Sequence, residues 1–304
     1  TDAVAPGPNC IRVEDGRIAA IGSGPGLRRG AREIDLAGCV AIPGLIDAHV
    51  HLDLDPEVAS LAEQVCVNED ERARNIEQRA IAMLRAGITT ARDLGGGSGL
   101  ELDLRDRIAA RLACGPRLLC AGQPVTRRGG HCHFWGGEAE SAAEQLRVIE
   151  RQLTRGVDWI KVMVTGGLLT RGTRMQDAQF SEDELRGIVV AAARHGRPVA
   201  AHCHGNAGIR NALRAGVRSI EHCSFAGAGG FGSDPDAGLV QEIAGSQSWV
   251  SPTVNVHWGR LARGADGRAS DFFERMSTVL RALVAAGATL VASTDAGIAG
   301  VAHD

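Results

Sequence analysis

The chain has 304 residues, of which 44% are hydrophobic and 23% are charged. These values are close to globular averages, so they exclude a disordered chain and a fibre. The 33 basic residues nearly balance the 36 acidic ones, which gives a net charge of −3 with no long block of one sign. We therefore expect no nucleic-acid partner and no membrane partner, and no apolar run approaches the roughly 18 residues of a spanning helix.

The eight cysteines are scattered along the chain, and none forms a Cys-x-x-Cys pair. This spacing is not typical of a disulfide framework or of a zinc ribbon. The first residues, Thr-Asp-Ala-Val, lack the charged and then apolar pattern of a secretory signal. These features favour a cytoplasmic protein with reduced thiols.

The first forty residues predict short strands. Asp15-Gly16 separates two apolar runs within residues 11–21, which indicates a β-hairpin. A second short extended piece is expected at Glu33–Leu36. We assign residues 1–42 to a small β-rich segment, for which the family resemblance described below implies a sandwich, and residues 43–304 to a separate domain.

After Pro43-Gly44 the sequence alternates apolar strands with helices. Apolar residues at helical spacing predict helices at Glu69–Arg85, Ala142–Arg155, Glu182–Arg194 and Asp271–Ala286. Short apolar runs predict eight strands, at Gly44–His51, Ile88–Leu94, Arg117–Ala121, Trp159–Val164, Val199–Cys203, Ser219–Cys223, Trp249–Val254 and Thr289–Ser293. Pro252 disfavours the seventh of them. Ser181 and Glu184 form a capping-box signal at the start of one helix.

Glycine joins the predicted helices to the strands that follow them. The four joins are Arg85-Ala-Gly-Ile, Arg155-Gly-Val, Arg214-Ala-Gly-Val and Ala286-Gly-Ala, and glycine ends a helix at little cost. This α/β alternation predicts a parallel (β/α)8 barrel of the TIM type, although it also allows a doubly wound open sheet. Since the chain ends about ten residues after the eighth strand, we expect the barrel to lack its last helix.

Ligand-type side chains end four of the predicted strands. His49 and His51 lie two residues apart, so they face the same side of the first strand. His202 and His222 end the fifth and sixth strands, and Asp295 follows the eighth. Barrel active sites assemble at these strand ends, and imidazole and carboxylate suit zinc. We interpret the set as a metal site.

Lys161 lies within the fourth strand and is the only lysine of the chain, against 32 arginines. An ammonium group would repel a metal ion. A lysine carbamate, formed with CO2, would instead supply two anionic oxygens, and arginine cannot form it. We therefore expect a carbamate on Lys161 that bridges metal ions, with an ordinary partly buried lysine as the alternative.

Several motifs of this sequence resemble those of a known family. Pro43-Gly-Leu-Ile-Asp-Ala-His-Val-His51 resembles the opening signature of the amidohydrolase superfamily, and Lys161, His202, His222 and Asp295 match its other metal positions in order. Thr165-Gly-Gly-Leu-Leu, Gln179-Phe-Ser-Glu-Asp-Glu-Leu185 and Arg127-Arg-Gly-Gly-His131 resemble its imidazolonepropionase-like and prolidase-like branch. The family fold is a barrel flanked by a β-sandwich built from both chain ends, so the sandwich of this chain is expected to be incomplete.

The resemblance implies a role for each matched residue. His49 and His51 would hold the more buried of two divalent metals, most plausibly zinc, and His202 and His222 would hold the second. Carboxylated Lys161 would bridge the two metals. Asp295 would bind the buried metal and act catalytically, by taking a proton from the attacking water.

Other polar residues are candidates for contact with the substrate. Four histidines are predicted to bind it: His131, His133, His204 and His303. His195 is predicted to be structural, and His257 lies in a loop after the seventh strand. Arg171 and Arg174 could clamp a substrate carboxylate, although a solvated loop is the alternative for them.

The sequence thus predicts a binuclear metal-dependent hydrolase that cleaves an amide-type C–N bond with metal-activated water. Its small-molecule substrate would be a dipeptide, an N-acyl amino acid or a related amide. Carbamates, ureas and lactones stay open, since a fold does not fix a substrate. One alternative is a mononuclear heterocycle aminohydrolase (deaminase), which Lys161 and the lack of a glutamate near His202 disfavour. The other is an inactive interaction protein. A homo-oligomer is possible.

Overall fold

The computed structural model describes all residues except 1–9, 24, 28–29, 59–63, 65–66 and 265–266. The chain divides into two compact units, Thr1–Pro43 and Gly44–Asp304. This division lies one residue beyond the predicted boundary between residues 42 and 43.

The first unit contains the predicted hairpin. Its strands, β1 (Cys10–Glu14) and β2 (Arg17–Gly22), pair antiparallel, and the short 3-10 turn η1 (Pro25–Leu27) follows. The turn residues Asp15 and Gly16 both have positive φ, 49° and 73°, as a two-residue turn that matches the strand twist requires.

The strand predicted at Glu33–Leu36 is wrong, because this segment has irregular backbone. Ile34 and Leu36 are 73% and 64% exposed. The apolar side chains that suggested a strand therefore have no core to pack into. A hairpin alone buries too little surface to order a third strand.

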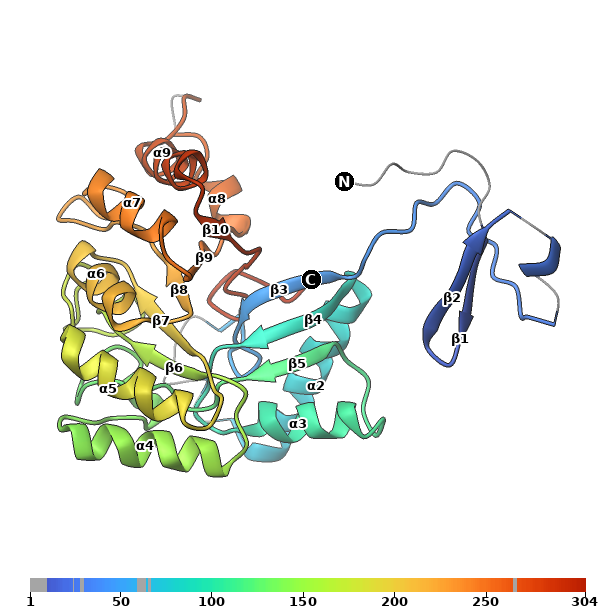
Figure 1. The fold of residues 1–304 in the computed structure, drawn as a ribbon, viewed down its shortest axis with the longest axis horizontal. Coiled ribbons are helices and arrows are strands. Elements are labelled where there is room, and N and C mark those ends of the chain that lie inside the picture. Colours follow the sequence, from blue (N-terminus) through green and yellow to red (C-terminus); the bar gives the residue numbers. More distant parts are fainter. Residues whose placement is uncertain (1–9, 24, 28–29, 59–63, 65–66, 265–266) are drawn as a thin grey trace. The chain divides into compact units, whose positions relative to one another are not determined.

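Parallel strands form the centre of the second unit (Figure 1). The described residues contain all eight predicted strands: β3 (Leu45–Val50), β4 (Ile88–Asp93), β5 (Arg117–Cys120), β6 (Ile160–Met163), β7 (Val199–Cys203), β8 (Ser219–His222), β9 (Trp249–Ser251) and β10 (Thr289–Leu290). They form two sheets, in the orders β3-β4-β5 and β10-β9-β8-β7-β6. Strand β9 stops just before Pro252, which has no N–H to donate to a sheet.

Backbone hydrogen bonds join the two sheets at both edges. Next to β6, the Val125 N–H donates to the Lys161 carbonyl (2.8 Å) and the Met163 N–H donates to the Val125 carbonyl (2.9 Å). Next to β3, the Asp295 N–H donates to the His49 carbonyl (2.8 Å) and the His51 N–H to the Ala296 carbonyl (2.7 Å). The arrangement is therefore TIM-barrel-like, and the carboxyl ends of its strands meet at one end.

Helices lie outside the strands (Figure 1). They are α2 (Glu69–Arg85), α3 (Leu100–Ala109), α4 (Ala142–Thr154), α5 (Glu182–Ala193), α6 (Asn206–Ala215), α7 (Ala237–Ala244) and α9 (Asp271–Ala286), with short helices η2 (His133–Trp135) and α8 (Val256–Arg260) in loops. The four predicted helices are confirmed to within one residue. The capping box is also confirmed, because the Ser181 and Glu184 side chains each accept the other's backbone N–H.

Glycines at the ends of the helices and within α6 shape how the helices are connected and packed. The glycines of all four helix–strand joins have positive φ, between 77° and 90°, as predicted. The Arg214-Ala-Gly-Val join predicted the end of helix α6, but no range was predicted for this helix, in which glycine and asparagine are unfavourable. Gly208 is needed there because a Cβ atom at this position would lie 2.3 Å from Thr165 Cγ2. Tertiary packing therefore outweighs local propensity in α6.

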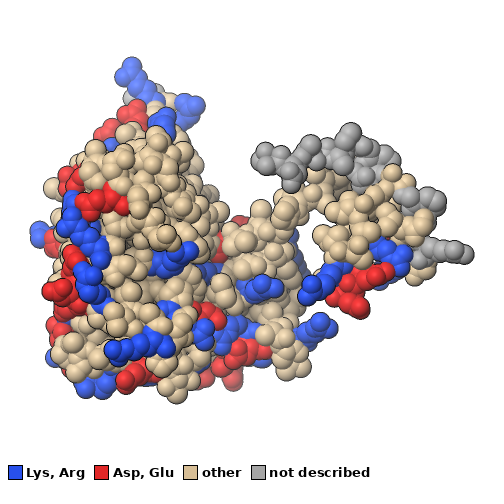
Figure 2. Space-filling model, viewed as in Figure 1, with Lys and Arg blue, Asp and Glu red and all other residues tan. Residues whose placement is uncertain are grey.

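The distribution of surface charge and the state of the cysteines match the expectations from the sequence. On the face of the second unit in Figure 2, basic and acidic side chains are interspersed, and no large patch of one sign is visible among the described residues. The described helices include none long and apolar enough to cross a membrane. The seven described cysteines are free thiols, and Cys66 lies outside the described residues.

Glu101, in the first turn of α3, is an unusual member of the core. It is fully buried, and neither carboxyl oxygen has a hydrogen-bond partner among the described residues. Burial, followed by repulsion from Asp93, raises the pKa of Glu101 to about 8. The folded protein thus keeps this group protonated at neutral pH, whereas the unfolded chain ionises it near its ordinary pKa of 4.5. Stability should therefore fall as pH rises from about 4.5 to 8.

We expect Glu101→Gln to be more stable than the parent at pH 8, and this advantage to shrink towards pH 5, because an amide does not ionise. Since one pKa unit corresponds to about 1.4 kcal/mol, the difference should reach a few kcal/mol. Urea unfolding at both pH values measures it. Glu150→Gln, at an exposed position on α4, is the control. An advantage that does not change with pH would contradict a protonated Glu101.

Candidate metal centre

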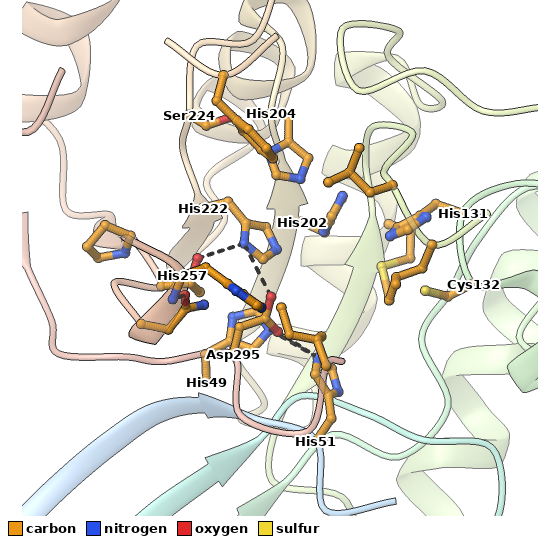
Figure 3. Close-up of a pocket in the computed structure, with 18 of the residues that line it drawn as sticks. His49, His51, His131, Cys132, His202, His204, His222, Ser224, His257 and Asp295 are labelled. Atoms are coloured by element: carbon orange, nitrogen blue, oxygen red, sulfur yellow. Dashed lines mark hydrogen bonds and ion pairs between the residues drawn. The ribbon is translucent and has the colours of Figure 1, made fainter. Parts of the chain in front are cut away.

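The carboxyl ends of the strands open into a cavity of about 270 Å³. All six residues predicted to form the metal site line it: His49, His51, Lys161, His202, His222 and Asp295. Figure 3 shows the rings of His49, His51 and His222 gathered around Asp295. The fold thus brings together side chains that are far apart in the sequence.

Three donor atoms surround one point at the base of the cavity. His49 Nε2 and His51 Nε2 lie 3.2 Å apart, and Asp295 Oδ1 lies 3.4 Å from each of them. These separations leave a point about 1.9 Å from all three atoms, close to the roughly 2.0–2.2 Å of zinc–nitrogen and zinc–oxygen contacts.

The second nitrogen of each ring faces a hydrogen-bond acceptor. His49 Nδ1 lies 2.8 Å from Glu221 Oε2, and His51 Nδ1 lies 2.7 Å from the Gly95 carbonyl. Each Nδ1 therefore carries the proton and donates, which leaves lone pairs on the two facing Nε2 atoms. Such lone pairs repel one another unless a cation lies between them, so the site fits a metal ion.

A second group of donors lies beside the first. One nitrogen each of His202, His204 and His222 lies within 4.8 Å of the others. His222 Nδ1 is 4.0 Å from Asp295 Oδ2 and 3.0 Å from Thr253 Oγ1. The Asp295 carboxylate therefore lies between the two groups, with one oxygen towards each. The two groups of donor atoms are thus neighbours in the cavity.

Burial keeps the imidazoles neutral. It lowers the pKa of His49 to about 4 and that of His204 to about 3, and it lowers the pKa values of His202 and His222 well below the usual range. Burial alone would raise the pKa of Asp295, but His49 and His51 hold it well below its usual value. The centre therefore offers neutral nitrogens and a carboxylate, the protonation states that bind metals.

Lys161 is buried in the same cavity, with 1% of its surface exposed. Its side-chain amine forms no hydrogen bond or ion pair with any other described residue. Burial lowers the pKa of its amine. Since the neutral amine is the form that reacts with CO2, this environment is compatible with the expected carbamate.

Three residues that follow the strands have strained backbones. His222, Thr253 and Asp295 have φ values of 66°, 50° and 63°, which residues other than glycine rarely adopt. Glu221 and His222 are neighbours on β8 and would point to opposite sides of a regular strand. The left-handed conformation ends the strand at His222 and lets both side chains reach the site. Strain of this kind is typical of functional sites.

Of the four histidines predicted to bind the substrate, two line the cavity and two do not. His131 and His204 line the cavity, and His131 Nδ1 has no hydrogen-bond partner among the described residues. His133 and His303 do not line it. His133 Nδ1 donates to the Gly130 carbonyl (3.1 Å) in the turn that starts η2, and His303 Nε2 lies 3.2 Å from the His51 carbonyl, behind the metal site.

The two arginines considered for a carboxylate clamp also lie outside the cavity lining. Arg174 pairs with Asp177 on the surface (2.7 Å), and Arg171 is exposed. His195 follows the end of α5 and is exposed. His257 does line the cavity, although its Nε2 is held by the Ala299 carbonyl (2.9 Å).

Glu221, which holds the His49 ring in place, was not identified from the sequence. Glu221 is completely buried and accepts hydrogen bonds from His49 Nδ1, from Arg92 (2.9 Å) and from the Ser219 hydroxyl. Burial alone would raise its pKa, but Arg92 and His49 hold it well below the usual range. Charged residues inside apolar predicted strands, as at Arg92 and Glu221, were the available signal. We infer that Glu221 orients His49 for the metal.

Comparison with known proteins identifies the family of this chain. Residues 40–302 match the model of the amidohydrolase family. Ochratoxinase from Aspergillus niger is 30% identical over 213 residues, which are 62% of this chain and 44% of that protein. Imidazolonepropionase from Saccharopolyspora erythraea is 28% identical over 242 residues, 70% of this chain and 56% of that protein. The chain thus spans about half the length of these curated relatives.

Solved structures share the fold. A Xaa-Pro dipeptidase with methionine bound in its active site has a TM-score of 0.71 and 28% identity, over 84% of this chain and 66% of that one. The ochratoxinase crystal structure has a TM-score of 0.70 and 26% identity, over 83% of this chain and 63% of that one.

We expect Glu221→Gln to weaken metal binding roughly 10- to 100-fold. The carboxylate accepts hydrogen bonds from His49 and Arg92 as an anion, and the neutral amide that replaces it does not. Chelator competition on refolded, metal-loaded protein measures the affinity, and circular dichroism checks the fold. Glu242→Gln is the control, since Glu242 pairs with Arg210 at the surface. Unchanged affinity in a folded Glu221→Gln protein would remove Glu221 from this positioning role.

Proposed function

The chain belongs to the amidohydrolase family, and from this premise we propose that it holds two divalent metal ions, with zinc the best match. We propose that it hydrolyses an amide-type C–N bond in a dipeptide, an N-acyl amino acid or a related amide. The observation that carries the proposal is the convergence of His49 Nε2, His51 Nε2 and Asp295 Oδ1 on one point. The names of the relatives, a dipeptidase and an imidazolonepropionase among them, support hydrolysis of this bond type.

The donors divide between two metal positions. His49, His51 and Asp295 would hold one ion, His202 and His222 the other, and a carbamate on Lys161 would bridge them. His204 lies close enough to His202 and His222 to compete as a donor. Bound there, divalent ions would lower the pKa of a water molecule and polarise the scissile carbonyl.

Asp295 is the group that moves the proton. Its Oδ1 faces His49 and His51, whereas among the described residues its Oδ2 pairs only with His222 Nδ1, at 4.0 Å. Oδ2 is thus free to accept a proton as the water oxygen bonds to the carbonyl carbon. The same proton then passes to the leaving nitrogen as the C–N bond breaks, so the carboxylate is regenerated.

The mononuclear deaminase alternative is less well supported. Among the described residues that line the cavity, Asp295 is the only carboxylate, so a second acid of the kind expected for such enzymes is missing. The lone lysine would also have no function there. Carbamate, urea and lactone hydrolysis would use the same groups, and substrate assays separate them from amide hydrolysis.

We also propose that the second unit is a closed (β/α)8 barrel, and that the first unit contributes to a small β-sandwich. The hydrogen bonds at both sheet edges support the barrel. The hairpin supports the sandwich, because Val13, Ile18 and Ile21 are each more than 60% exposed. An apolar hairpin face of this kind is typical of a strand pair that packs against another sheet.

We expect Lys161→Arg to lose the second metal ion, because a guanidinium group cannot form a carbamate. Metal analysis should find two ions per chain in the parent, after expression with added metal and bicarbonate, and one or fewer in the variant. Circular dichroism should show the fold retained. Two ions per chain and normal turnover in Lys161→Arg would exclude the carbamate.

We expect Asp295→Asn to slow hydrolysis by roughly 10²–10⁴-fold even at saturating metal, because an amide does not accept the proton. A screen of dipeptides and N-acyl amino acids identifies a substrate, and steady-state rates across pH then compare the two proteins. The acidic limb of the parent profile should be absent from the variant. Fast turnover by metal-loaded Asp295→Asn would leave Asp295 as a ligand at most.

A further inference from the structure

The cavity has two chemically different parts. Its base carries the imidazoles and Asp295, whereas one side wall is apolar and is formed by Phe231, Trp258, Leu261, Phe272 and Met276. We refer to these five residues as the aromatic wall. They come from the loop after β8, from α8 and the residue after it, and from α9. None of them belongs to the proposed metal site.

Ring contacts hold the aromatic wall in place. Phe231 and Phe272 meet edge to face, with centroids 5.8 Å apart, and Trp258 meets Phe272 in the same way at 5.5 Å. Phe231 also contacts the His204 ring at 5.4 Å. The apolar surface is therefore preorganised and continuous with the metal site. A substrate held at the metals would place one substituent against it.

The polar side chains next to the wall are already engaged. Asn255 donates to the Thr294 carbonyl (2.8 Å) and accepts the His257 N–H (3.0 Å), while His257 Nε2 donates to the Ala299 carbonyl (2.9 Å). These bonds brace the loops and engage one Asn255 Nδ2 hydrogen, Asn255 Oδ1 and His257 Nε2.

No arginine among the described residues lines the cavity, and the guanidinium of Arg275, next to Met276 on α9, is engaged by the Phe231 carbonyl (3.1 Å). Among the described residues, Lys161 is the only lysine or arginine that lines the cavity. A substrate carboxylate placed against the wall would lose its hydration without gaining a partner, which is strongly unfavourable.

On the basis of the proposed function, we infer that the aromatic wall binds a bulky, uncharged, apolar substituent of the substrate amide. The site would thus select arylalkyl amides over substrates that carry a free carboxylate on that side, such as a dipeptide with its terminal carboxylate against the wall. An arylalkyl group replaces water on the preorganised rings and leaves no buried charge unpaired.

Binding of simple amides to the zinc-loaded protein tests the inference without requiring turnover. The ring-bearing probes are N-(2-phenylethyl)acetamide and N-methyl-3-phenylpropanamide, which carry the ring on opposite sides of the amide. N-methylacetamide is the ringless reference, and the para-carboxylates of the two ring-bearing probes add the charge. Titration calorimetry should find at least one ring-bearing probe bound about 10-fold more tightly than the reference, and its para-carboxylate should lose this gain.

Two neighbouring phenylalanines on α9 supply a matched pair of variants. Phe272 and Phe273 are both half-buried, but only Phe272 lines the cavity. Phe272→Ala should remove the 10-fold preference for the ring, and Phe273→Ala should keep it. Equal effects of the two substitutions, or a para-carboxylate that binds as tightly as the neutral probe, would overturn the inference.

A gain-of-charge variant keeps the test decisive if Phe272→Ala does not fold. Leu261 lines the cavity and is 47% exposed, so its replacement should be tolerated. Leu261→Arg should bind the para-carboxylate about 10-fold more tightly than the parent does. No gain in this variant would mean that the substituent does not lie against the wall.

Turnover of the same probes separates this inference from the proposed function. Selective binding of the ring-bearing probes without hydrolysis of any amide in the screen would support the aromatic wall and overturn amide hydrolysis. Hydrolysis without ring selectivity would support the proposed function and overturn the role of the wall.

Discussion

The organisation of this protein depends on two facing imidazole nitrogens. His49 Nε2 and His51 Nε2 are 3.2 Å apart, and both lone pairs are directed there because each Nδ1 is held by an acceptor. Without a cation this arrangement is repulsive, so the surrounding structure must impose it. The buried Glu221, itself neutralised by Arg92, orients one ring, and the Gly95 carbonyl orients the other. A catalytic metal site requires this preorganisation.

The barrel-like sheet explains how distant residues reach the site. Strands β3 and β10 lie at opposite ends of the second unit's sequence, yet backbone hydrogen bonds between residues 49–51 and 295–296 place them side by side. The same bonds bring Asp295 next to His49 and His51. Left-handed residues at the strand ends then turn side chains into the cavity. The hydrogen bonds that join the two sheets therefore also bring these three side chains together.

The cavity combines this polar base with apolar walls, and the two parts have separate origins. The strand ends supply the metal donors, whereas the aromatic wall comes from loops and helix starts after β8, β9 and α8. Loops can change without disturbing the strands, so the reaction and the choice of substrate can vary independently in such a fold. The relatives illustrate this, since an ochratoxinase and a Xaa-Pro dipeptidase share the architecture.

Sequence patterns determined the strands and the four strongest helices, and they identified six residues that the fold brings into one cavity. Apolar runs and glycine joins are local signals, and His-Val-His at a strand end places two donors on one face. Local signals could not place Glu33–Leu36, because a strand forms only where another strand pairs with it. Only the tertiary structure decided that His204 lies beside His202 and His222 and that His133 and His303 do not line the cavity. It also decided that Glu221 supports His49, since this contact joins residues 172 positions apart, and proximity of that kind arises only when the chain folds.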